Sequence, residues 1–460
     1  MRKNKLLALG LAALMAASVA GCSTPSASVG DTKAAESGSD SSQSAAAGEK
    51  IFRYSNTADI ATIDPDKTNS VADATVSYHI YDGLYRNVQG ELQPATAESY
   101  EVSDDGLVYT FKLRQDTKWS DGQTVTAKDY EYGMKRLCDP AAACPASYLG
   151  AVLKNGAKVS GGELSVDELG VKALDDFTLE ITLENPADYF VSMTSMSAFM
   201  PVREDLVEKY GNEFGGSADK QVYNGPFVVT EYANGKVELA KNPDYYDNEK
   251  ISLDGVEILT VADQTTAVSM FDAGELDLAE VPTELAAQYE GKTQSYYSGA
   301  DDYAALNHRN KYLANKNLRL AMNYAVNREE YILLTHNGLY QANQRYVLPQ
   351  VRGVDGEYGT EYPLEAFPLQ GDMDKAKEYL DTALSELGLS SASDISLKLV
   401  VADSDTAKKE AEVVANQWKN NLGINVDINM VPYATRNALL VPDSDEYDII
   451  MSGWAPDYSD

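Results

Sequence analysis

A strand–helix–strand pattern between residues 395 and 428 constrains the fold more than any other part of this 460-residue chain. Apolar residues alternate over 395–401 and again over 424–428, which predicts two strands. Between them, apolar residues recur at helical spacing: Ala407, Ala411, Val414, Trp418 and Leu422. Gly423 is placed to end this helix. Because a strand, a helix and a second strand in this order form a right-handed crossover, we expect a parallel pair in an α/β domain.

The chain before residue 304 has a different pattern. Strict alternation predicts half-buried strands at 107–114 and 177–183. Two more predicted strands, 222–232 and 235–240, are separated by the hairpin signal Asn234-Gly235. The other elements predicted here are strands at 51–54 and 256–261 and helices at 71–84, at 265–271 and from Thr126 onward. The change of pattern near residue 304 predicts two lobes with a cleft between them.

The amino terminus predicts export. A basic n-region precedes an apolar stretch at 6–19, which is too short to span a bilayer. Small residues then lead to Cys22 in a pattern that resembles a bacterial lipobox. We therefore expect a signal peptide at 1–21, a lipid on the Cys22 sulfur as the only membrane anchor, and a disordered tether at 22–49. The alternative is an ordinary secreted protein with a chance cysteine.

Charge and the absence of catalytic motifs narrow the function. The formal net charge of −33 repels phosphate, so we expect no nucleic-acid partner. The three histidines, His79, His308 and His336, do not cluster, and the chain contains no zinc-protease, serine-hydrolase or P-loop motif. We expect no metal, no cofactor and no enzymatic activity. A secreted hydrolase remains as a distant alternative.

The two cysteines within the folded part are Cys138 and Cys144. Because an exported protein folds under oxidising conditions, we expect them to form a disulfide. It would close a small loop and stabilise the fold by roughly 2 kcal/mol. A zinc site is disfavoured because no histidine is close in sequence.

The stretch 453–460 carries the candidate binding chemistry. It follows an apolar strand predicted at 447–451, and it places Asp457 between two aromatic residues. A carboxylate held against apolar walls suits a cationic head group, such as the free amino end of a peptide. The alternative is that Asp457 is an exposed acid.

Seven segments together resemble one protein family. They are 63–65, 103–122, 174–183, 223–227, 241–246, 273–277 and 453–457. In this order they are similar to the bacterial extracellular oligopeptide-binding proteins of ABC importers, also called family 5 solute-binding proteins. The resemblance covers the chain from about residue 50 to its last residue.

The resemblance implies an α/β fold of the two-lobed, type II periplasmic-binding-protein kind, whose lobes close over a ligand. Lobe one would comprise 50–92 and 222–303, with an inserted subdomain at 93–221, and lobe two would comprise 304–460. The family fold also implies further residues after Asp460, including a return to lobe one. Lobe two would then be incomplete here.

The resemblance also implies a set of ligand-binding residues. Asp457 would accept the α-amino group of a peptide, Trp454 would form a pocket wall, and Gly453 and Ala455 would pair their backbone with the ligand. The other positions that match are Asn69, Ser70 and Val71 on lobe one, together with Tyr148, Asn307 and Tyr433. Alternatives are that Val71 belongs to a helix core, that Tyr148 packs on its own subdomain and that Asn307 caps a turn.

One departure from the family concerns the ligand's carboxyl end. Some relatives carry basic residues on the strand before the tryptophan, whereas 448–451 contains none here. The expected function is nevertheless capture of oligopeptides by a monomer that delivers them to ABC permease subunits. A peptide-sensing or adhesive surface lipoprotein, or a family member that binds a non-peptide solute, is the alternative.

Overall fold

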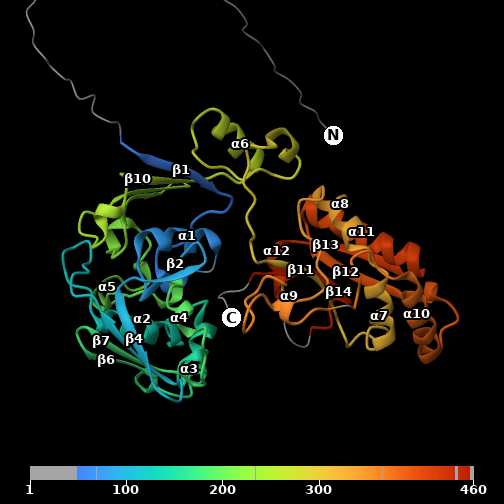
Figure 1. Cartoon of the computed structure of the whole chain (residues 1–460), viewed down its shortest axis with the longest axis horizontal. Helices are drawn as coiled ribbons and strands as arrows, with labels where there is room; N and C mark the ends of the chain where they lie inside the picture. The colour runs from blue at the N-terminus through green and yellow to red at the C-terminus, as the bar shows by residue number, and fades with distance from the viewer. Residues whose placement is uncertain (1–48, 69, 234, 365, 441–443, 456–460) are drawn as a thin grey trace, which may run out of the picture. The chain divides into compact units, whose positions relative to one another are not determined.

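The computed structural model describes residues 49–68, 70–233, 235–364, 366–440 and 444–455 (Figure 1). Within these residues the strands form three four-stranded sheets and one two-stranded sheet. The predicted signal peptide, Cys22, Asn69 and Asp457 lie outside the described residues. Among the described helices, none is both long and apolar enough to cross a membrane.

The first sheet joins the start of the described chain to a hairpin far along it. Its order is β1 (Ile51–Asn56), β10 (Gly255–Thr260), β9 (Lys236–Lys241) and β8 (Phe227–Ala233). β1 pairs with β10 in parallel, and the other pairs are antiparallel. The predicted hairpin of β8 and β9 is therefore confirmed. β8 begins later than predicted because the residues before it bond elsewhere: Gly225 donates its N–H to the Ile80 carbonyl, 2.9 Å away.

A second, antiparallel sheet has the order β4 (Ala97–Val102), β5 (Val108–Leu113), β7 (Thr178–Thr182) and β6 (Val171–Asp175). α2 (Ala127–Cys138) packs on β6 and β7. It begins where predicted, because Thr126 and Asp129 form a capping box. The two-stranded sheet consists of β2 (Tyr85–Val88) and β3 (Glu91–Pro94).

Shorter helices connect these sheets. They are α1 (Val71–Ile80), α3 (Gly156–Ser160), α4 (Phe190–Met193), α5 (Glu204–Tyr210) and α6 (Gln264–Asp272). α1 ends four residues before the predicted limit of Leu84. The reason is that Tyr81 is extended and Asp82 donates its N–H to the Asn224 side chain, 3.1 Å away.

One continuous core fills this part of the chain. Buried side chains from Tyr54 to Ile258 form a single cluster, which includes Phe111, Trp119 and Tyr130. Trp119 and Tyr130 come from the predicted insertion, whereas Tyr54 and Ile258 come from the predicted lobe one. The two predicted units therefore share their apolar interior.

The third four-stranded sheet begins after residue 300. Its order is β11 (Asp301–Leu306), β14 (Ile449–Trp454), β12 (Ser396–Ala402) and β13 (Asn425–Val431). β12 and β13 pair in parallel, as their strand–helix–strand pattern predicted. The helices of this part are α7 (Lys316–Tyr324), α8 (Arg328–His336), α9 (Tyr358–Glu361), α10 (Met373–Leu387), α11 (Asp405–Leu422) and α12 (Tyr433–Ala438).

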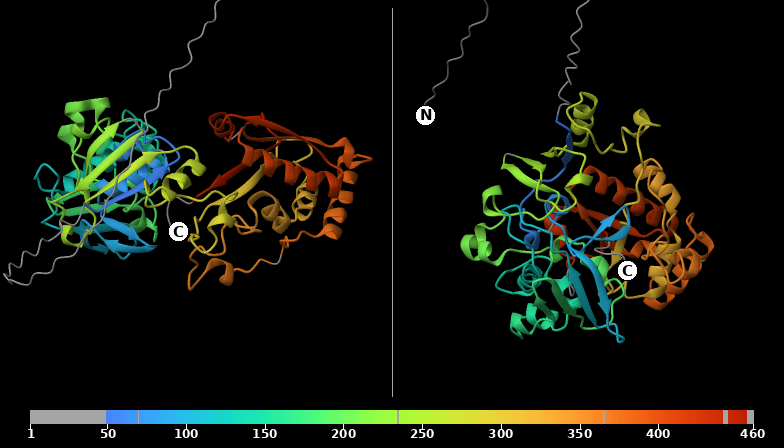
Figure 2. Two further views of the ribbon diagram at one scale, coloured as in Figure 1. Left: turned by 90° about the horizontal axis from the view of Figure 1, so that it is seen from above. Right: turned by 60° about the vertical axis from the view of Figure 1, so that its left-hand side comes forward.

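α11 is the crossover helix between the parallel strands, and it lies against β12 and β13 (Figure 2). Its buried face joins a second core, in which Trp418 donates its indole N–H to the Met322 carbonyl, 3.0 Å away. Gly423 ends α11 with a φ of 80°, a conformation that suits glycine. The predicted α/β arrangement of this part is confirmed.

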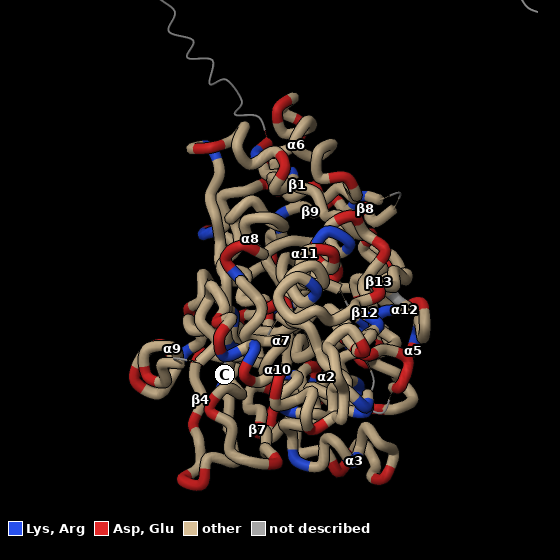
Figure 3. The backbone as a smooth tube through the Cα atoms, turned by 90° about the vertical axis from the view of Figure 1, so that its right-hand side faces the viewer, with Lys and Arg blue, Asp and Glu red and all other residues tan. Residues whose placement is uncertain are grey.

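Acidic residues, drawn red, are spread along the backbone together with basic residues, drawn blue (Figure 3). Acidic residues are in excess over basic ones. This excess reflects the composition, with 71 Asp and Glu against 38 Lys and Arg.

Candidate functional site

The carboxyl end of β14 has one unpaired edge. β14 pairs with β11 along its whole length, from Ile449 to Trp454. On its other side, it pairs with β12 only through Ile449 and Ile450. Among the described residues, 451–454 therefore have one edge without a strand partner. An open edge of this kind can accept an added extended chain through backbone hydrogen bonds.

Trp454 and Ser452 lie on one face of β14, because side chains alternate along a strand. Trp454 is 49% exposed at the end of the strand, opposite Asp301 of β11. Ala455 comes directly after the strand and is exposed. The indole predicted to form a pocket wall is therefore accessible beside the open edge.

Gly453 lies on the opposite face, directly across from Asp302 of β11. A Cβ at position 453 would fall 2.4 Å from Asp302 Oδ1, so only glycine fits without displacing that carboxylate. Burial, reinforced by the negative charge of Glu410, raises the pKa of the Asp302 carboxyl. A side chain at position 453 would therefore require the exposed Asp302 carboxylate to move.

A paired histidine acts on the same carboxylate of Asp302. His336 Nε2 lies 3.0 Å from Glu410 Oε1, and the His336 ring stacks on Tyr340 with centroids 4.0 Å apart. In the sequence, His336 stood out only as an isolated histidine. Its partner Glu410 comes from α11, 74 residues away, so no local motif could indicate the pair.

α12 places two further side chains near β14. Tyr433, which was predicted to line the ligand site, is the first residue of α12 and is 62% exposed. Its ring lies under the guanidinium of Arg436, with Cζ 4.8 Å from the ring centroid. Arg436 in turn donates from Nη1 to Ser452 Oγ, 2.6 Å away. The structure thus links Tyr433 to β14 through a residue that was not predicted.

Asn307 is occupied by the chain itself. Its side-chain Nδ2 donates to the carbonyls of Ser444 and Tyr447, both at 2.9 Å. Its backbone N–H donates to the Asp448 carbonyl, 2.8 Å away. These bonds fix the segment that leads into β14. Asn307 therefore positions the strand, and contact with a ligand stays a prediction.

The predicted lobe-one residues lie at the start of α1. Ser70 is the N-cap, and its Oγ accepts a hydrogen bond from the Asp73 N–H, 3.1 Å away. Val71 is 84% exposed, so the alternative that it belongs to a helix core is wrong. Tyr148 is 57% exposed in a 3-10 segment, Ser147–Val152. The structure leaves the ligand roles of these residues as predictions.

Cys138 and Cys144 are both free and buried, so the predicted disulfide is not formed in the structure. The two sulfurs have different surroundings. Cys144 Sγ lies 3.5 Å from the Arg136 carbonyl, whereas Cys138 Sγ packs against Gly150. Burial raises the pKa of the Cys138 thiol to about 11 and that of the Cys144 thiol to about 12.

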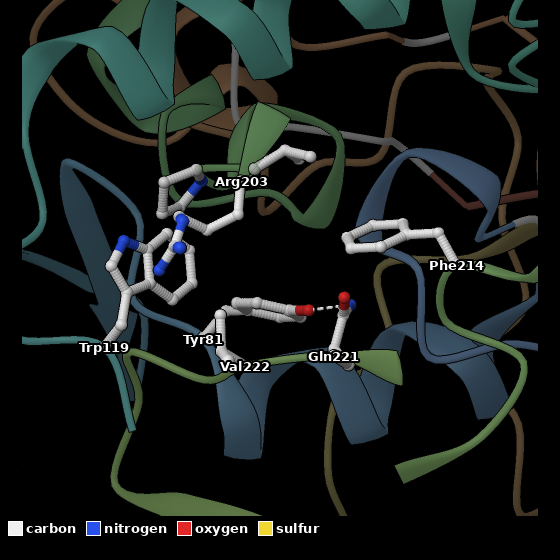
Figure 4. A pocket seen from close by; sticks show the side chains of 8 residues that line it. Tyr81, Trp119, Arg203, Phe214, Gln221 and Val222 are labelled. Carbon is white, nitrogen blue, oxygen red and sulfur yellow. Dashed lines mark hydrogen bonds between the residues drawn. The ribbon is translucent and has the colours of Figure 1, made fainter. Parts of the chain in front are cut away.

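Two hollows in the described part of the chain are lined by residues outside β14. The first lies between side chains of the first core and has no space for a water molecule (Figure 4). There Gln221 donates to the Tyr81 hydroxyl, and Phe214, Trp119 and Arg203 are among the other lining residues. This hollow is a packing void rather than a ligand site.

The second hollow, of about 350 Å³, is lined by residues of β11, α7 and the segment between them. These residues are Leu306, His308, Lys316, Arg319, Leu320 and Asn323.

Among the described residues, no group of three or more His, Cys, Asp or Glu side chains is arranged to hold a metal ion.

Comparison with known proteins identifies the family. Residues 91–460 match the family model of bacterial extracellular solute-binding proteins, family 5. The chain belongs to this family. Its relatives include the oligopeptide-binding protein OppA of Bacillus subtilis, which is 31% identical over 409 residues. That match covers 87% of this chain and 74% of the relative.

Solved structures agree with this assignment. OppA of Listeria monocytogenes, solved with a bound peptide, is 30% identical, with a TM-score of 0.73 over 90% of this chain and 82% of that one. The peptide-binding pheromone receptor PrgZ is 27% identical, with a TM-score of 0.71 over 90% of this chain and 82% of the receptor. The predicted type II binding-protein fold is confirmed.

Proposed function

We propose that this solute-binding protein captures oligopeptides and delivers them to the permease of an ABC importer. The observation that carries this proposal is the open edge of 451–454 beside the exposed Trp454. OppA of Bacillus subtilis is named as an oligopeptide-binding protein, and OppA of Listeria monocytogenes, which shares the fold, was solved with a bound peptide.

Backbone pairing accounts for broad specificity. An extended peptide that adds to the open edge of β14 bonds through its main chain, which is the same in every peptide. Gly453 and Ala455 offer main-chain groups there, and Trp454 covers the side chains of the added strand. The bound peptide would therefore be selected by its backbone and its ends.

Asp457 fixes the register by accepting the peptide's α-amino group. Asp457 follows Trp454, the last residue of β14, by three residues in the sequence. Lobe one contributes the edge formed by Asn69, Ser70 and Val71. Contacts of the ligand with both lobes drive their closure. In this proposal lobe one comprises 50–92 and 222–303, and lobe two comprises 304–460.

The protein works at the outer face of the cell membrane. The family consists of extracellular proteins. A lipid on Cys22 retains the monomer near the permease, and the Ser- and Ala-rich tether at 22–49 lets it reach that partner. Metabolic labelling with a fatty-acid probe tests this, and a Cys22→Ala protein that is released to the medium is the expected result.

A second candidate function is peptide sensing. The similarity to a pheromone receptor favours it, because that protein also binds a peptide. The two functions share one binding site and differ in the step after binding. Deletion of the gene should abolish uptake of labelled peptide if the protein serves import, and should leave uptake unchanged if it serves sensing alone.

The binding proposal is tested with a random pentapeptide library. The wild-type protein is incubated with the library in free and N-acetylated forms, and retained peptides are identified by mass spectrometry. We expect retention of free peptides at least tenfold above acetylated ones. Equal retention of both forms would reject amine capture. Retention of neither would reject oligopeptide binding itself.

A further inference from the structure

Arg436 is a buried arginine whose guanidinium has few hydrogen-bond partners among the described residues. The residue is only 8% exposed. Its one hydrogen bond runs from Nη1 to Ser452 Oγ, at 2.6 Å, and Nε is buried without a partner among the described residues. Within that same part of the chain, Arg436 forms no ion pair.

Two arginines of the first core show one way in which little-exposed guanidinium groups are paired in this chain. Arg136, with a side chain 9% exposed, bonds to the carboxylates of Asp64 and Asp66 at 2.6 and 2.7 Å. Arg203, with a side chain 7% exposed, pairs with two aspartates at 2.8 and 3.0 Å. A guanidinium presents five N–H donors and favours a bidentate carboxylate, so burial without one is unfavourable. Arg436 departs from the pattern set by these two arginines.

The surroundings of Arg436 suit an added anion. Tyr433 offers its ring face and Ser452 its hydroxyl, and neither carries a negative charge. Asp302 reaches Arg436 only as a distant charge, because its side chain lies on the other face of the sheet, with Gly453. The positive charge of Arg436 is therefore available to pair with an anionic group of a ligand.

Its position points to the ligand in question. Ser452 belongs to the segment of β14 with the open edge, and Trp454 lies two residues further on the same face. Any chain that adds to this edge passes next to the guanidinium. Residues 448–451 contain no basic residue, and Arg436 on α12 places a positive charge beside Ser452.

We propose that Arg436 binds a carboxylate of the captured peptide and thereby selects peptides that carry one near β14. This inference rests on the proposed function. Two parts of a peptide carry this chemistry, the terminal carboxyl group and an Asp or Glu side chain. In either case the guanidinium forms a bidentate pair that replaces the missing acidic partner.

Three peptide libraries separate these sources. The first contains random pentapeptides without Asp or Glu as free acids, the second contains the same peptides as amides, and the third contains amides that include Asp and Glu. Retention on the wild-type protein is measured by mass spectrometry. If the terminal carboxylate is bound, free acids are retained about tenfold or more above the plain amides. If a side chain is bound, the acidic amides are retained above the plain amides instead.

Variants of Arg436 provide the second arm. Arg436→Gln should remove the preference for carboxylate-bearing peptides, and Arg436→Lys should restore it in part, because lysine keeps the charge but loses the fork. Lys419→Gln is the matched control, since it removes one positive charge from an exposed position of α11. Circular dichroism and thermal unfolding check that each variant folds.

The outcomes keep the two proposals apart. Retention of no peptide at all by the wild-type protein would reject oligopeptide capture. Retention of acids and both kinds of amide to the same extent would reject the role of Arg436 and leave oligopeptide capture standing. A preference that survives in Arg436→Gln would also reject it. The library comparison on the wild-type protein can reject the proposal without any variant, and Arg436→Lys, which keeps the charge, tests the assignment to this residue if Arg436→Gln does not fold.

Discussion

Gly453 lies opposite Asp302 so closely that a Cβ at position 453 would approach Asp302 Oδ1 to 2.4 Å. We predict that Gly453→Ala displaces the Asp302 carboxylate. Because Asp302 is exposed, its side chain can move toward solvent, and the free energy of unfolding should fall by about 1 kcal/mol or less. Thermal unfolding measures this, and Asp302→Ala in the same chain should restore most of the loss. A double variant as unstable as Gly453→Ala alone would contradict the explanation.

Asp457→Ala is predicted to weaken peptide binding while leaving the fold intact. If Asp457 holds a buried ammonium group, its loss costs roughly 3–5 kcal/mol, or about 2–4 decades in affinity. Isothermal titration calorimetry with a retained pentapeptide measures the change. Asp381→Ala, which removes an exposed carboxylate from α10, is the control and should bind like the wild type. Equal affinity of both variants would remove Asp457 from the site.

Arg136 is predicted to be essential for the first core. It lies between two buried carboxylates, those of Asp64 and Asp66, whose side chains are 2% and 0% exposed. Arg136→Ala leaves both without their cation, so unfolding should become easier by about 3–5 kcal/mol at pH 8. Arg114→Ala is the control, because Arg114 pairs with the exposed Asp116, and it should cost about 1 kcal/mol or less. Chemical denaturation of both variants provides the comparison.

Asp66 is predicted to make the stability of the first core fall as the pH rises from about 4 to about 7. Burial raises the pKa of the Asp66 carboxyl to about 7, although Arg136 acts against this shift. The folded protein therefore holds a proton that the unfolded chain has released, since the unfolded pKa is about 3.9. The stabilisation by this proton is fully present below the pKa of the unfolded state and is lost as the pH rises above the pKa of the folded state. Between the two, the free energy of unfolding falls by up to about 1.4 kcal/mol per pH unit.

Asp66→Asn isolates this contribution. Denaturation at about pH 4.5, 6 and 7.5, within and just above the window, compares the variant with the wild type. As the pH rises through this window, the free energy of unfolding of the wild type should fall relative to that of Asp66→Asn. A constant difference would show that Asp66 does not take up a proton there.

Patterns contained within one element were predicted well. The capping box of Thr126 and Asp129, the glycine that ends α11 and the parallel pairing of β12 with β13 all derive from short-range spacing. Ends that depend on distant partners were not. α1 stops at Ile80 because the segment after it bonds to Asn224, 142 residues from Asp82, and periodicity within α1 contains no trace of that bond.

The candidate site shows the same division. Gly453, Trp454 and Ala455 could be found from one motif, because they adjoin each other in sequence and lie together at the end of β14. Arg436 could not, since its relation to Ser452 depends on how α12 lies relative to the sheet. Its position three residues after Tyr433, on one helix face, was the only local signal. The disulfide failed for a related reason, because sequence proximity does not fix where two side chains point.

The interior that runs from Tyr54 to Ile258 also limits how this receptor can be trimmed. Deleting 93–221 would remove Phe111, Trp119 and Tyr130 from the core. The apolar side chains that pack against them would then be exposed to water. Residues 93–221 therefore do not form a separable unit, because they provide part of the core that the flanking segments also need. Any shortened version meant to stay in solution has to keep both halves.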